Sequence, residues 1–214
     1  MKVYIAFVDE NVLIDAEKMR FLPAERCEKI KQFRFDEDKR ISFVCGMMIR
    51  HFAVKEKIIM SGAVKLAYGK YGKPYYPNYP KYHFSVSHTQ KCVVYTSSDV
   101  PVGIDVEENS RADETLNSIA KASFTHDEYN EIMQSSDSAS EFLRIWTAKE
   151  AFLKCTGEGL TRPLDSFSVF DMPQGYELSQ VVYKDNFITV CCKGKCDDIV
   201  IEELPIERII AHEE

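Results

Sequence analysis

Two carboxylates separated by a single residue are the first feature with the chemistry of a metal site. Asp105 and Glu107 lie in the segment GIDVE at residues 103–107. Because alternate side chains of a β-strand share a face, the two carboxylates would project together while Ile104 and Val106 face a core. Neighbouring carboxylates repel unless a cation lies between them, and oxygen ligands suit a hard cation such as magnesium. The pair therefore predicts a magnesium site, with a solvated strand face as the alternative.

A second set of polar residues recurs along the segment WTAKEAFLK at residues 146–154. At 3.6 residues per turn, Thr147, Glu150 and Lys154 form one stripe of a helix beside an apolar face. Glu150 would add a third carboxylate, and Lys154 a positive charge one turn further on. The simpler alternative is a surface ion pair between these two residues, whose spacing and order are favourable. Lys149 falls on or beside the apolar face, so its amine must find a partner or reach solvent.

Polar residues also end one alternating segment and fill one turn in the first half of the chain. Ser87 and His88 close the run FSVSH at residues 84–88, where the end of a strand can present them to a ligand. Lys73 lies in the turn GKYGKP at residues 69–74, and its ammonium can meet a phosphate as a point charge. Each feature alone is equally compatible with an exposed residue of no function or a plain surface hairpin.

The elements that must position these residues are predicted from hydrophobic spacing and turn residues. Helical periodicity predicts helices that begin near Pro23, Asp36 and Ser138. Capping-box spacing marks two helix starts, Thr125 with Glu128 and Ser138 with Glu141. Alternating or apolar runs predict strands at residues 1–9, 83–87, 92–96, 102–107, 167–170, 180–183 and 187–190. The segment 97–101 separates two of these strands and predicts two subdomains, residues 1–100 and 101–214.

Composition and charge argue against several classes of protein. The chain has 214 residues and a net charge of −7, which disfavours nucleic-acid binding because that binding depends on Lys and Arg contacts to phosphate. No apolar run approaches the roughly 18 residues that span a bilayer, and the first residues lack the apolar region of a signal peptide. The seven irregularly spaced cysteines are typical of reduced cytoplasmic thiols. Cys191, Cys192 and Cys196 lack a fourth ligand for zinc.

Together, the order and spacing of the segments resemble the Sfp-type 4′-phosphopantetheinyl transferases. The segments that carry the resemblance are YGKP at 71–74, FSVSH at 84–88, GIDVE at 103–107, WTAKEAFLK at 146–154, GEGL at 157–160 and PLDSFSV at 163–169. The resemblance covers roughly residues 1–170, and its most specific part is Asp-x-Glu followed by Trp-x-x-Lys-Glu-x-x-x-Lys. It implies an α/β (α+β) fold of two similar subdomains related by a pseudo-twofold axis, with the active site in the cleft between them.

The resemblance also implies roles for individual residues. The metal ligands would be Asp105, Glu107 and Glu150, and the catalytic set would be Glu150, Lys154 and His88. Glu150, or a water beside it, would act as the general base. Contacts to coenzyme A would come from Arg40, Lys73, Ser87, His88 and Lys154. Candidates for binding the 3′-phosphate of coenzyme A are Arg26, Lys29 and Lys31.

The reaction that the resemblance implies needs magnesium, coenzyme A and an apo acyl or peptidyl carrier protein. A carrier serine would attack the β-phosphate of coenzyme A and expel adenosine 3′,5′-bisphosphate, with no nucleic acid or membrane as partner and the enzyme acting as a monomer. The carrier would dock on residues 110–124, through Leu116, Ile119 and Lys121, although the two apolar residues could equally be ordinary core. A magnesium-dependent nuclease or phosphohydrolase and an inactive binding module are the competing classes. Fatty-acid, polyketide, peptide-synthetase and lysine-pathway carriers all remain open.

Overall fold

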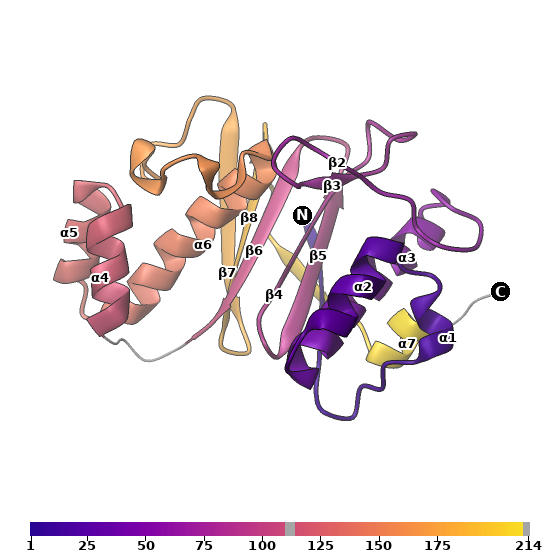
Figure 1. Ribbon diagram of the computed structural model, residues 1–214. Helices are drawn as coiled ribbons and strands as arrows, with labels where there is room; N and C mark the ends of the chain where they lie inside the picture. The colour runs from indigo at the N-terminus through magenta and orange to yellow at the C-terminus, as the bar shows by residue number, and fades with distance from the viewer. Residues whose placement is uncertain (110–113, 212–214) are drawn as a thin grey trace.

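The computed structural model describes residues 1–109 and 114–211. The strands are β1 (Lys2–Phe7), β2 (Ala67–Tyr68), β3 (Pro74–Tyr75), β4 (His83–His88), β5 (Cys92–Ser98), β6 (Val102–Glu108), β7 (Tyr176–Tyr183), β8 (Asn186–Lys193) and β9 (Val200–Glu203). The helices are α1 (Ala16–Met19), α2 (Ala24–Gln32), α3 (Asp36–Lys55), α4 (Glu114–Ser123), α5 (His126–Gln134), α6 (Ser138–Thr156) and α7 (Ile206–Ile210), with short 3-10 turns η1 (Gly159–Thr161) and η2 (Leu164–Ser166). In Figure 1 the main strands occupy the middle of the molecule, with α4, α5 and α6 on one side and α1, α2, α3 and α7 on the other.

The two halves of the chain share one connectivity. In each half a first strand leads to one long helix, α3 or α6, and then to a pair of antiparallel strands, β4 with β5 or β7 with β8. The first strand then pairs antiparallel with the last strand of its half, which gives the strand orders β1-β5-β4 and β6-β8-β7. This confirms the predicted α/β fold with two similar subdomains.

Alternation along the central strands divides their buried side chains among three cores. On β1, Val3 and Ile5 face the second sheet and pack with Ile104, whereas Tyr4 and Ala6 belong to the core beneath α3. The side chains of β8 that face away from the first sheet pack under α6. The layers therefore run in the order α3, first sheet, second sheet, α6, and β6 lies between the other sheet and the helix that carries residues 146–154.

The end of the described chain returns to the first half. Strand β9 pairs in parallel with β1, and Ile209 and Ile210 of α7 join the core beneath α3. The predicted division at residue 100 separates β5 from β6, but residues 200–210, which it assigned to the second subdomain, pack on the first. The edge of β1 opposite β5 explains this, because an unpaired strand edge exposes backbone hydrogen-bonding groups that β9 satisfies.

Local predictions succeed where the hydrogen bonds lie within a few residues. The capping box at Thr125 is confirmed, since its hydroxyl accepts from the Glu128 amide while the Glu128 carboxylate accepts from the Thr125 amide. The box predicted at Ser138 is wrong, because Asp137 is the residue that caps α6. The predicted strand 167–170 is also wrong. Its backbone groups bond to side chains: the Phe167 carbonyl accepts from Lys149, and the Val169 amide donates to Glu128.

Gly103 lets β6 lie directly on α6. A Cβ at this position would be 2.1 Å from the Ala151 carbonyl oxygen and 2.3 Å from the Cys155 nitrogen. We expect Gly103→Ala to lower the free energy of unfolding by about 1–3 kcal/mol, because the two backbones must separate. Gly69→Ala is the matched control, since a Cβ there meets only the Lys73 oxygen at 3.7 Å. Equal urea midpoints for the two variants would contradict this view of the β6–α6 contact.

Candidate active site

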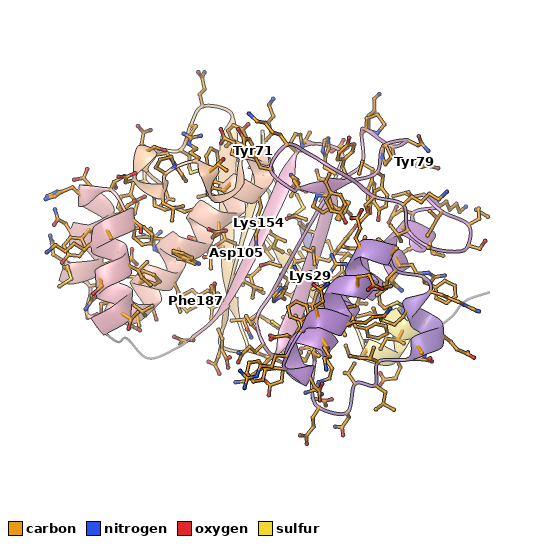
Figure 2. The ribbon with its side chains drawn as sticks, viewed as in Figure 1. Lys29, Tyr71, Tyr79, Asp105, Lys154 and Phe187 are labelled. Atoms are coloured by element: carbon orange, nitrogen blue, oxygen red, sulfur yellow. The ribbon has the colours of Figure 1, made fainter. Side chains whose placement is uncertain are left out.

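The predicted polar residues gather where β4, β6 and α6 meet. Figure 2 shows Asp105 and Lys154 close together near the centre of the molecule. A pocket of about 220 Å³ adjoins them, and residues of both halves line it, including Lys73, Ser85 and Lys154. The carboxylates and the cations of the sequence motifs therefore meet at the junction between the two halves.

Asp105 is the centre of this junction. Ile104 and Val106 are fully buried between the sheets, as alternation predicted, and Asp105 points to the α6 side with 4% of its surface exposed. Its Oδ1 accepts from the Ser87 hydroxyl at 2.9 Å and from the Lys154 ammonium at 2.6 Å. The same ammonium donates to the Ser87 oxygen at 2.7 Å. Lys154 therefore bonds across to β6, and the alternative of a surface pair with Glu150 does not account for its position.

Two carboxylate oxygens at this junction have no hydrogen-bond partner in the described part of the chain. Asp105 Oδ2 and Glu150 Oε1 are buried and, among the described residues, accept no hydrogen bond. A buried polar atom left without a partner costs free energy, and far more so when it carries charge. Burial, together with the charge of Asp105, raises the pKa of Glu150. A bound cation would satisfy both oxygens and relieve this repulsion, so these two residues fit a magnesium ion.

Glu107 completes the acidic set but faces a different partner. The Trp146 indole nitrogen donates to Glu107 Oε1 at 3.2 Å. Burial, followed by the charge of Asp105, raises the pKa of Glu107 to about 7. In residues 1–109 and 114–211 no three His, Cys, Asp or Glu side chains stand together as a preformed metal site. Trp146, for which the sequence predicted no contact, is one helical turn before Glu150 and orients one oxygen of Glu107.

The two serines of the FSVSH segment hold the halves together. The Ser85 hydroxyl oxygen accepts from the Ile104 amide at 3.0 Å, and Ser87 bonds to Asp105 and Lys154. Ser87 was predicted to contact coenzyme A, but in this structure its hydroxyl is engaged by the protein. Ser85 was missed, although its spacing of two from Ser87 put both serines on one face of the strand.

Lys73 also bonds to the protein itself. Its ammonium donates to the backbone carbonyls of Val102 at 2.9 Å and Cys155 at 3.0 Å. The predicted contact to a coenzyme A phosphate would have to compete with these bonds. The physical reason is that the last carbonyls of a helix have no partner within the helix, and the end of α6 offers one to the nearest donor.

The remaining basic residues divide into two groups. Burial, with the charges of Lys154 and Arg26, lowers the pKa of His88, so these three residues share one positive region. Arg40 lines a different hollow, together with Asp9, Glu37 and Lys91. Its contact to coenzyme A stays a prediction.

The other two candidates for the 3′-phosphate lie on α2. Lys31 is exposed and pairs with Glu28 at 2.7 Å. Lys29, labelled in Figure 2, acts electrostatically on buried Cys45, as do Arg26 and Lys154. Lys29 therefore belongs to the positive region of His88, Arg26 and Lys154, whereas Lys31 is already paired with Glu28.

The predicted docking segment is only partly described. Residues 110–113 lie outside the described part of the chain. Leu116 and Ile119 are partly buried and pack on the core that α4 shares with α5 and α6, which is the alternative that the sequence left open. Lys121 is exposed in the last turn of α4.

Comparisons with known proteins agree with this geometry. Residues 101–201 match the model of the 4′-phosphopantetheinyl transferase superfamily, and residues 16–100 match that of a 4′-phosphopantetheinyl transferase N-terminal domain. A 4′-phosphopantetheinyl transferase of Bacillus subtilis is 32% identical over 83% of this chain and 84% of its own length. The chain belongs to the 4′-phosphopantetheinyl transferase family. The resemblance identified from the sequence motifs is thereby confirmed, and the protein is a transferase.

Other relatives of this phosphopantetheinyl transferase extend beyond one genus. The transferase Sfp of Bacillus subtilis is 30% identical over 79% of this chain and 76% of its own length. The L-aminoadipate-semialdehyde dehydrogenase-phosphopantetheinyl transferase of Saccharomyces cerevisiae is 27% identical over 76% of this chain and 64% of its own length. In the described residues of the transferase, no helix is both long and apolar enough to cross a bilayer.

Proposed function

We propose that this transferase moves 4′-phosphopantetheine from coenzyme A to a serine of an apo acyl or peptidyl carrier protein, with magnesium bound by Asp105, Glu107 and Glu150. The observation that carries the magnesium site is the pair of buried, unpartnered oxygens on Asp105 and Glu150. Their carboxylates come from β6 and α6, so one cation would be held between the two elements. Bound magnesium would neutralise charge on the pyrophosphate and polarise the phosphorus that is attacked.

The protein side chains supply the proton transfer and the remaining charge. Glu150 would also take the proton of the carrier serine, directly or through a water, with the carboxylate oxygen that the cation leaves free. Lys154 brings an ammonium to the same carboxylates and would stabilise negative charge on the departing phosphate. The acceptor serine belongs to the carrier, so the enzyme needs no nucleophile of its own.

Coenzyme A would lie across the positive region on the first half. The charges of Lys154 and Arg26 act on His88, and Lys29 lies on the same helix as Arg26. We assign His88 to the phosphates of coenzyme A, with Arg26 and Lys29 as the candidates for its 3′-phosphate. A lysine or arginine placed in this way acts mainly on substrate affinity.

The reaction is proposed to take place in the cytoplasm, with the enzyme as a monomer. All seven cysteines are free thiols in the structure, as a reducing compartment requires. One relative is named for action on L-aminoadipate-semialdehyde dehydrogenase, so the lysine-pathway carrier stands beside fatty-acid, polyketide and peptide-synthetase carriers as an acceptor to be tested.

The deciding experiment incubates the protein with coenzyme A, magnesium chloride and a panel of apo carrier proteins. Intact-mass spectrometry of each carrier should show addition of the phosphopantetheine group, and EDTA should prevent it. If no carrier of the panel gains mass under any condition, while an active transferase modifies each of them, the proposal is overturned. Release of phosphate or cleavage of coenzyme A without carrier modification would indicate a phosphohydrolase instead.

Lys154→Ala should separate the role of the lysine from that of the metal ligands. We expect kcat to fall by about 10²-fold, because one preorganised charge is lost where the phosphate bond breaks. The half-saturating magnesium concentration should not rise, since the ammonium that shares Asp105 Oδ1 is removed. Glu150→Gln is the contrast and should raise the magnesium requirement. Near-normal single-turnover rates in both variants would show that α6 is not part of the active site.

A further inference from the structure

A hairpin of the first half reaches across to the second half through one side chain. Lys73 lies in the hairpin between β2 and β3, and its ammonium donates to Val102 O at 2.9 Å and Cys155 O at 3.0 Å. Both acceptors belong to the second half. Lys73 therefore bridges Val102 and Cys155, which are 53 positions apart in the chain.

The two acceptors are close in the chain to the residues of the proposed metal site. Val102 is the first residue of β6, the strand that carries Asp105 and Glu107. Cys155 is in the last turn of α6 and is the next residue after Lys154. The ammonium thus joins the start of the strand that carries two carboxylates to the end of the helix that carries the third.

The packing around this bridge leaves little freedom. Gly103 lets the β6 backbone touch the α6 backbone at Ala151 and Cys155. Gly157, which ends α6 with a φ of +75°, lies over the Lys73 side chain, since a Cβ there would be 3.4 Å from Lys73 Cδ. The absence of two side chains therefore brings strand, helix end and lysine stem into direct contact.

The ammonium of Lys73 is placed as a cation at a helix end and not as a member of an ion pair. No salt bridge between Lys73 and a carboxylate occurs in the described part of the chain. A cation at the C-terminus of a helix is stabilised by the partial negative charge of the last carbonyls. Burial lowers the pKa of Lys73, as expected for an ammonium whose acceptors are neutral backbone groups.

We propose that Lys73 is a positioning residue that sets the separation of β6 and α6, and with it the spacing of the Asp105 and Glu150 oxygens that would share magnesium. This inference rests on the proposed function, because the spacing of the two oxygens matters only if they bind magnesium. A metal site depends on ligand positions that outer groups hold, and loss of such a group typically costs 10- to 100-fold in affinity or activity.

The test compares Lys73→Met, which keeps the stem but removes the donors, with the wild-type protein. We expect the half-saturating magnesium concentration to rise by about tenfold or more, and kcat at saturating coenzyme A to fall, while KM for coenzyme A changes less than either. The rise in Tm that magnesium chloride produces without coenzyme A should shrink, because binding to the folded state is weaker. Should Lys73→Met fail to fold, Lys73→Gln replaces it in the same measurements.

Two further variants sharpen the comparison. Lys73→Arg should keep the magnesium dependence within about twofold of wild type, because the guanidinium retains both charge and donors. Lys81→Met is the matched control, since Lys81 is an exposed lysine between β3 and β4, and it should behave as wild type.

Each contrary result has one meaning. A higher KM for coenzyme A with kcat and magnesium dependence unchanged would show that Lys73 binds a phosphate, and would overturn the proposal. A lower Tm with unchanged magnesium response and kcat would show a purely structural role, and would also overturn it. The wild-type protein is measured first. If its transfer needs no magnesium, the proposed metal site itself is wrong. If the wild type needs magnesium and Lys73→Met behaves like it, only the proposed role of Lys73 is wrong.

Discussion

Asp105→Asn should lower kcat/KM for phosphopantetheine transfer by roughly 10³-fold or more, about 4 kcal/mol of transition-state stabilisation. The substitution keeps the shape of the side chain but removes the charge that faces both the proposed cation and Lys154. It also leaves Ser87 and Lys154 next to a weaker acceptor. Stability should change little, because the lost ion pair is offset by relief of repulsion with Glu107 and Glu150.

The measurement is transfer to an apo carrier at several magnesium concentrations, with thermal unfolding of the same samples. Asp99→Asn is the matched control, because Asp99 is an exposed aspartate just before β6. It should retain wild-type transfer. Wild-type rates in Asp105→Asn would remove the aspartate from the active site, whereas a large fall in Tm would mean that its role is mainly structural.

Lys149→Met should destabilise the protein by about 3–5 kcal/mol, the usual cost of removing one partner of a buried ion pair. Lys149 and Glu128 have fully buried side chains, and their charged atoms are 2.8 Å apart. The ammonium also donates to Leu164 O and Phe167 O at 2.7 Å each. Loss of the amine leaves a buried carboxylate without its counter-charge and two carbonyls without a donor.

Urea unfolding of the wild-type protein and three variants checks this expectation. The double variant Lys149→Met with Glu128→Gln should recover part of the lost stability, because no uncompensated charge remains. Lys31→Met is the control, since its pair with Glu28 is exposed and such pairs are worth about 0–1 kcal/mol. A loss in Lys149→Met no larger than that in Lys31→Met would mean that the buried pair contributes nothing to stability.

Several parts of the fold and the candidate site follow from local sequence patterns. Alternation along residues 102–107 correctly divided Ile104 and Val106 from Asp105, and helical spacing put Glu150 and Lys154 on one stripe. The long helix at residues 36–55 and the capping box at Thr125 were likewise predicted. Each of these depends on residues within one or two turns of each other, so periodicity and turn chemistry are enough to decide them.

Tertiary structure decided which of those residues touch across elements. Lys154 bonds to Asp105, 49 positions away, and Lys73 to the ends of β6 and α6, because packing brings those atoms together. Likewise, the backbone of residues 167–170 bonds to the buried Lys149–Glu128 pair and forms no strand. Periodicity specifies the face on which a side chain lies, but not the distance between two faces. Here that distance depends on the missing side chain at Gly103 and on hydrogen-bond partners remote in the chain.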